Sequence, residues 1–167
     1  MNNDNLEIER KFLIKYPDMP MLERCAVGTE ITQTYLVSEA KGETARVRKR
    51  GMDGAYTYTH TVKTKISDMR RVEIEREVSA EEYDLLLQDA DPKRSTIFKQ
   101  RWCLRYEGQL FEIDIFPFWQ DKAIMEIELT DEAQPVVFPP EIEIIKEVTH
   151  DKRYTNASMA KRIPEDD

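Results

Sequence analysis

Charged residues two positions apart recur along this chain, and the first set lies in Glu7–Lys11. On a β-strand, residues two apart share a face, so Glu7, Glu9 and Lys11 would line one side and Ile8 and Phe12 the other. Carboxylates can hold divalent cations, and ammonium groups can hold anions. A strand face with both signs could therefore bind a metal ion together with a phosphate-like anion.

Later strand-like segments sort their charges by sign. The basic sets are Arg46, Arg48 and Arg50, then Lys63 and Lys65; the acidic pairs are Glu73 and Glu75, Glu112 and Asp114, and Glu126 and Glu128. Like charges on one face repel, so this arrangement costs energy unless something binds between them. The alternative is a scaffold barrel with an apolar centre and a solvated charged face.

Charged faces turned toward an interior tunnel would explain the sorting. Buried charge costs several kcal/mol per ion without compensation, so we expect cations beside the carboxylates and an anion beside the basic residues. Oxygen ligands favour Mg²⁺, Mn²⁺ or Ca²⁺ over zinc. His60 and His150 are far apart in the sequence and are interpreted as surface or structural residues.

The alternation predicts a mainly β (α+β) protein, an eight-stranded antiparallel β-barrel or strongly curved sheet with helices on the outside. The expected strands are residues 5–15, 30–38, 44–50, 55–66, 71–78, 96–106, 110–116 and 123–130. Ser79 and Glu82 form a capping box that predicts a helix to about Asp89. Residues 19–27 suggest a short helical turn and 157–163 a closing helix, while residues 131–147 receive no assignment.

Composition limits the classes of function. The chain has 167 residues, which predicts one domain over residues 1–167, and its net charge of −8 argues against nucleic acid as a partner. We expect no membrane association, because no apolar run approaches the ~20 residues of a membrane span. Without a signal-peptide pattern, and with Cys25 and Cys103 interpreted as reduced thiols, a cytoplasmic location is expected.

The motifs also resemble a known family. Glu7–Lys11 matches the ExExK signature of the CYTH superfamily, also called triphosphate tunnel metalloenzymes. Further matches follow in order: Gln33–Leu36, Arg46–Arg48, Val62–Lys63, Glu73–Glu75, Lys99–Arg101, Phe111–Asp114, Glu126–Glu128 and Glu147–Tyr154. The resemblance covers almost the whole chain and is closest to short bacterial members that hydrolyse inorganic tripolyphosphate.

The resemblance implies a charged tunnel that binds a linear triphosphate and, with Mg²⁺ or Mn²⁺ (two ions with substrate), hydrolyses a phosphoanhydride bond. The implied phosphate contacts are Lys11, Arg46, Arg48, Lys63, Arg101 and Lys152. The implied metal ligands are Glu7, Glu9, Glu126 and Glu128, with Glu73, Glu75, Glu112 and Asp114 as further candidates. Glu9, Tyr35 and Lys99 are the implied catalytic residues, the lysine polarising the terminal phosphate; core packing is the alternative for Tyr35.

Several alternatives stay open. Within the superfamily the chain could be a class IV adenylate cyclase or a thiamine or nucleoside triphosphatase, although no segment suggests adenine recognition. Outside catalysis, it could be a polyphosphate-binding module without turnover. A homodimer is a further alternative.

Overall fold

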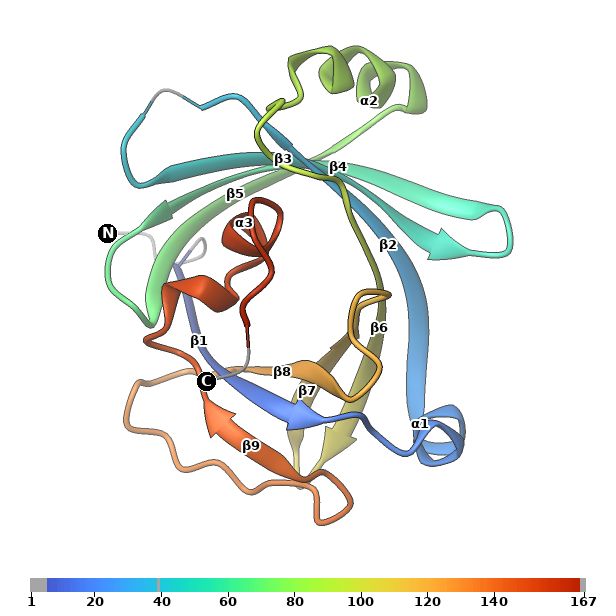
Figure 1. Cartoon of the computed structure of the whole chain (residues 1–167), viewed down its shortest axis with the longest axis vertical. Coiled ribbons are helices and arrows are strands. Elements are labelled where there is room, and N and C mark those ends of the chain that lie inside the picture. Colours follow the sequence, from blue (N-terminus) through green and yellow to red (C-terminus); the bar gives the residue numbers. More distant parts are fainter. Residues whose placement is uncertain (1–5, 39, 166–167) are drawn as a thin grey trace.

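An antiparallel sheet of nine strands forms most of the protein (Figure 1). The computed structural model describes residues 6–38 and 40–165. The strands are β1 (Leu6–Lys15), β2 (Ala26–Leu36), β3 (Glu43–Met52), β4 (Ala55–Lys65), β5 (Arg70–Val78), β6 (Ile97–Tyr106), β7 (Gln109–Ile115), β8 (Lys122–Glu128) and β9 (Ile144–Glu147). The predicted mainly β architecture is confirmed.

Strands β1 to β8 close into a ring. They follow the order β5-β4-β3-β2-β6-β7-β8-β1, and β5 pairs back with β1 where Leu6–Ile8 face Arg70–Val72. Strand β9 is an addition that the sequence did not predict, and it pairs with Phe12–Ile14 of β1. Because β8 occupies one edge of β1, β5 and β9 share the other edge.

Short helices begin at side-chain caps. Helix α1 (Met19–Cys25) is capped by Asp18, and α2 (Ala80–Leu86) by Ser79, which accepts from the backbone N–H of Glu82 as the capping box predicts. The expected helix to Asp89 ends earlier, because its last turn is the 3-10 helix η1 (Leu87–Asp89). Within the described residues, no helix is long and apolar enough to cross a membrane.

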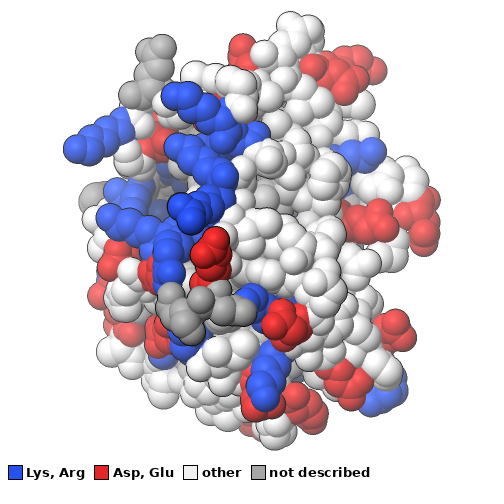
Figure 2. All heavy atoms as spheres, viewed as in Figure 1, with Lys and Arg blue, Asp and Glu red and all other residues white. Residues whose placement is uncertain are grey.

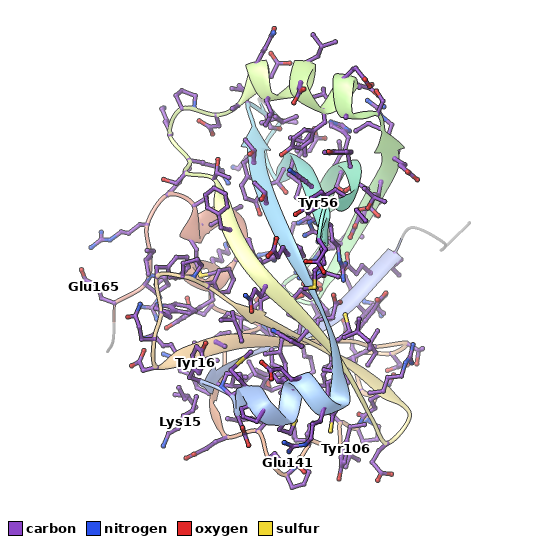
Figure 3. The ribbon with its side chains drawn as sticks, turned by 90° about the vertical axis from the view of Figure 1, so that its right-hand side faces the viewer. Lys15, Tyr16, Tyr56, Tyr106, Glu141 and Glu165 are labelled. Atoms are coloured by element: carbon purple, nitrogen blue, oxygen red, sulfur yellow. The ribbon has the colours of Figure 1, made fainter. Side chains whose placement is uncertain are left out.

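Apolar outer faces of the ring lie beneath α1 and α2. Met21 and Leu22 of α1 pack in one core cluster with Phe12 and Ile14, and Figure 3 shows α1 at the bottom of the view, where Tyr16 and Tyr106 are labelled. Tyr83 of α2 packs in a second cluster on the outer faces of β3 and β5. On these sides the predicted orientation, with apolar residues outward under helices, is confirmed.

One end of the tunnel is apolar, and the C-terminal segment covers it. Leu13, two positions after Lys11 on the same strand face, packs with Ile97 and Ile124 and with Tyr154 of η2 (Lys152–Tyr154). Helix α3 (Asn156–Met159) lies within the ring outline in Figure 1. The expectation that all helices lie outside is therefore wrong for α3, and the predicted helix 157–163 is shorter, because its apolar residues fill the tunnel end.

Candidate active site

The inward strand faces enclose a cavity of about 770 Å³. It is lined by almost every candidate from the sequence: Glu7, Glu9, Lys11, Tyr35, Arg46, Arg48, Lys63, Glu73, Glu75, Lys99, Arg101, Glu112, Glu126, Glu128 and Lys152. Antiparallel pairing brings them together, since it sets Glu9 opposite Glu128 and Lys11 opposite Glu126 on one face. The scaffold alternative, with the charges on an outer face, is wrong.

Asp114 is the predicted ligand that does not line the cavity. Its Oδ1 accepts from Arg101 Nε at 2.8 Å, and its Oδ2 accepts from Lys99 Nζ at 2.8 Å and from Arg101 Nη2 at 2.9 Å. Burial raises the pKa of Asp114, but Arg101 and Lys99 outweigh this and lower it far below its ordinary value. Both oxygens are occupied by cations, so the structure favours a counter-charge role over metal ligation.

Two lysines connect the tunnel wall to the C-terminal segment. Lys99 Nζ donates to Asn156 Oδ1 at 3.1 Å, and Lys11 Nζ donates to the carbonyl oxygen of Tyr154 at 3.3 Å. Lys11 also forms an ion pair of 3.2 Å with Glu126. Burial, with Arg101 nearby, lowers the pKa of Lys99 well below its ordinary value. These lysines lie where the cavity meets its apolar end.

Arg46 and Arg48 on β3 make the wall strongly positive. Nε and Nη2 of Arg48 donate to Oε1 of Gln33 at 3.0 and 2.6 Å. Burial, together with Arg46 and Arg101, lowers the pKa of Arg48 to about 9. Nε of Arg46 is buried and has no acceptor among the described residues. A wall of this kind is suited to a multiply charged anion.

Carboxylates crowd another part of the cavity. Burial and the adjoining carboxyl of Glu73 raise the pKa of Glu7 to about 9, even though Lys63 Nζ lies 3.6 Å from Glu7 Oε2. Burial, with Glu112 and Glu9 nearby, also raises the pKa of Glu128. Burial also raises the pKa of Glu73, but the Glu7 carboxyl, Lys63 and Arg46 outweigh this and lower it. The carboxylates of this group therefore differ in how well their charge is compensated.

This acidic group fits a divalent cation by its chemistry. The donors are carboxylate oxygens, which suit Mg²⁺ or Mn²⁺, and the buried Glu7 Oε2 lacks a hydrogen-bond donor within the described chain. Among the described residues, however, no three metal-ligating side chains are already arranged around one point. The carboxylates would have to turn toward an arriving ion.

Tyr35 both packs in the core and reaches the cavity. Its ring packs in the apolar cluster at the tunnel end, and its side chain also lines the cavity. Its hydroxyl oxygen accepts a hydrogen bond of 2.6 Å from Gln33 Nε2.

Sequence reasoning missed several residues at or near the cavity, and three of them stand out. Arg71 lines it and lies 3.2 Å from Glu9, and its place on the face of Glu73 could have revealed it. Arg94 lines the cavity from a loop with no periodic pattern. Gln33 belongs to the matched segment Gln33–Leu36 but received no role, because it is uncharged and the search was for charged faces.

The charge distribution agrees with this description. Figure 2 shows Lys and Arg side chains gathered in one band, over the region where β5 and α3 lie in Figure 1. Acidic side chains lie along the opposite edge of that view and also directly below the band. The positive potential is therefore local, although the net charge of the chain is −8.

Known proteins share this sequence and fold. An inorganic triphosphatase of Nitrosomonas europaea is 30% identical over 161 residues, covering 95% of this chain and 99% of the relative. Another, from Acetivibrio thermocellus, is 32% identical over 156 residues, covering 93% of each. The crystal structure of an inorganic triphosphatase superposes with a TM-score of 0.61 at 30% identity, covering 95% of this chain and 97% of that one. The sequence profile of the CYTH domain matches residues 5–162, and the chain therefore belongs to the CYTH domain family.

Proposed function

We propose that the protein is a divalent-metal-dependent triphosphatase that hydrolyses a phosphoanhydride bond of inorganic tripolyphosphate. One observation carries the proposal: a basic wall and a group of carboxylates face the same cavity. A linear triphosphate needs both, since its oxygens require cationic donors and its charge requires metal ions. The relatives named inorganic triphosphatase support the choice of substrate.

Arg46 and Arg48 are the first phosphate contacts, because neither forms an ion pair with a carboxylate in the described chain. Their planar guanidinium groups can hold phosphate oxygens in pairs. The other proposed contacts are Lys11, Lys63, Arg101 and Lys152, all of which line the cavity. On binding, Lys11, Lys63 and Arg101 would exchange their carboxylate partners for phosphate oxygens. Those partners, Glu126, Glu73 and Glu112, would turn to the metal ions.

Glu7, Glu9, Glu73 and Glu128 are the residues that would hold Mg²⁺ or Mn²⁺, with Glu112, Glu75 and Glu126 lining the same cavity. When bound, the ions would neutralise phosphate charge and lower the pKa of a nearby water. Burial and neighbouring carboxyl groups raise the pKa values of Glu7 and Glu128. A cation bound beside these groups would stabilise their charged forms.

Hydrolysis requires a water oxygen to bond to a terminal phosphorus while the bridging P–O bond breaks, which yields pyrophosphate and orthophosphate. A carboxylate beside the water accepts its proton, and Glu9 is our first choice because it is buried among the acidic residues. Lys99 and the hydroxyl of Tyr35 line the cavity together and would donate to the terminal phosphate.

The test is a substrate panel: tripolyphosphate, ATP, thiamine triphosphate and pyrophosphate, each with Mg²⁺ and with Mn²⁺. Released phosphate and cyclic AMP are both measured. We expect tripolyphosphate to be the best substrate, and we expect Glu9→Gln to abolish turnover while the melting temperature stays near that of the wild type.

Other outcomes would assign a different function. Efficient formation of cyclic AMP from ATP would make the protein a cyclase. Preference for ATP or thiamine triphosphate would identify another triphosphatase. Stabilisation by tripolyphosphate without any turnover would leave a binding module, since ligand binding raises the melting temperature by mass action alone.

A further inference from the structure

Gln33 occupies an unusual place in the tunnel wall. It lies on the inward face of β2, opposite Arg48 on β3, and its side chain is completely buried. It does not line the cavity, so it can act on a ligand only through the residues that it holds. Those residues are Arg48 and Tyr35, and both line the cavity.

The hydrogen-bonding groups of these residues fix the orientation of the Gln33 amide. Arginine has only donors, so the amide oxygen must face Arg48, where it accepts from Nε at 3.0 Å and Nη2 at 2.6 Å. The amide nitrogen then donates to the Tyr35 hydroxyl oxygen at 2.6 Å. Since that oxygen accepts from Gln33, the hydroxyl hydrogen of Tyr35 can be donated to another group.

The partner of Arg48 differs in charge from the partners of its neighbours. Lys11 pairs with Glu126, Lys63 with Glu73, Arg71 with Glu9, and both Lys99 and Arg101 with Asp114. Within the described chain, all hydrogen bonds of Arg48 go to the neutral amide of Gln33. Arg48 is thus held in place by a neutral acceptor, and no carboxylate of the described chain is hydrogen-bonded to it.

We propose that Gln33 is a positioning residue that fixes the guanidinium of Arg48 through an uncharged acceptor, so that its full positive charge faces the bound triphosphate. The same amide directs the Tyr35 hydroxyl hydrogen toward that anion. A carboxylate at this position would hold Arg48 equally well but would neutralise it. This inference rests on the proposed triphosphate function.

The decisive variant is Gln33→Glu, which keeps the size and the acceptor but adds a charge. Gln100→Glu is the matched control, because Gln100 is an exposed residue on neighbouring β6 and receives the same charge change. We expect Gln33→Glu to raise KM and the calorimetric Kd for tripolyphosphate by about tenfold, the effect of losing one charge-assisted contact. The melting temperature should not fall, and the control should keep the wild-type Kd.

A purely structural role predicts the opposite, since the carboxylate would still anchor Arg48. Wild-type Kd and KM in a stable Gln33→Glu protein would therefore overturn the proposal. Calorimetry measures binding without turnover. A wild-type protein that binds tripolyphosphate without cleaving it would refute the enzyme assignment, and the effect of Gln33→Glu on the Kd could still be measured. A wild type that does not bind tripolyphosphate would refute both.

A double-mutant cycle covers the case in which Gln33→Glu fails to fold. Gln33→Leu removes all three hydrogen bonds of the amide without adding charge, and it should raise the Kd several-fold in the wild-type background. In an Arg48→Met background most of this effect should disappear, because the change acts through Arg48. Equal effects in both backgrounds would contradict the inference.

Discussion

Lys99 Nζ lies 2.8 Å from Asp114 Oδ2, and both side chains are almost completely buried in the tunnel wall. The same carboxylate binds Arg101 through two hydrogen bonds. One buried anion therefore serves two buried cations, and Arg101 also forms an ion pair of 2.7 Å with Glu112. Removal of a single partner from a buried set of charges is costly, because the others remain desolvated.

Asp114→Asn should strongly destabilise the free protein. We expect a loss of about 3–5 kcal/mol in the free energy of unfolding, since Lys99 and Arg101 lose their shared counter-charge. Urea denaturation measures this loss. Asp121→Asn, at an exposed position, is the control and should remain within about 0.5 kcal/mol of the wild type. An equally small loss for Asp114→Asn would disprove the counter-charge role.

Arg46→Met should impair function without impairing stability. Nε of Arg46 is buried without an acceptor in the described chain, so its removal relieves the free protein of a buried, unsatisfied donor. We expect KM for tripolyphosphate to rise by about tenfold or more, as one charged contact to phosphate is lost. The melting temperature should stay equal or increase. Arg76→Met, which removes an exposed ion pair with Glu82, should leave KM unchanged.

Glu128→Gln should weaken metal binding. Glu128 lies opposite Glu9, and burial together with Glu112 and Glu9 raises its pKa. We expect the affinity for Mn²⁺ to fall by about tenfold, because one charged oxygen ligand is lost. Titration followed by the electron paramagnetic resonance of free Mn²⁺ measures the change. Glu77→Gln on β5 is the control, and equal affinities for the two variants would exclude Glu128 as a ligand.

The ion pair between Arg10 and Glu147 should make stability depend on pH at the β1–β9 contact. Hydrogen bonds from Arg10 at 2.6 and 3.0 Å lower the pKa of Glu147. A lowered carboxyl pKa adds stability above the ordinary value of 4.5, and this stability is lost as the pH falls through the folded-state pKa.

Glu147→Gln should therefore lower stability at pH 7 by at most about 1 kcal/mol, because the pair is partly exposed. The difference from the wild type should disappear under acidic conditions. Glu143→Gln is the control, since its ion pair with Lys15 is largely exposed and should contribute little at any pH. Thermal melting of each protein across the pH range gives the comparison. A pH-independent difference for Glu147→Gln would contradict the assignment.

Strict alternation made the eight strands of the ring predictable, and the segment around Thr57–Lys65 is the clearest example. Strand β9 has four residues and no alternation that stands out, and tertiary contacts hold it, such as that of Glu147 with Arg10. Helix α3 ends early because its apolar residues are needed in the tunnel end. Such features depend on distant partners, which a local pattern does not contain.

The same distinction applies to the site. Face periodicity was sufficient to predict which charged side chains share the cavity. It was insufficient to predict that Asp114 lies opposite Arg101 and forms an ion pair with it. The register between two strands depends on both of them, so the pattern of one segment does not determine it. Gln33 received no role from the sequence for a different reason. An uncharged residue does not stand out on a strand face that is recognised by its charges.

The division of one edge of β1 between two partners makes the barrel unequal in strength around its circumference. Within the described residues, the seam with β5 comprises Leu6–Ile8 and Arg70–Val72, whereas the ladders of β3 with β4 and of β4 with β5 are longer. Local opening of the sheet should begin at the β1–β5 seam. The backbone amides of this seam should therefore exchange with deuterium before those of β3 and β4. The tunnel wall could then part lengthwise while most of the sheet stays intact.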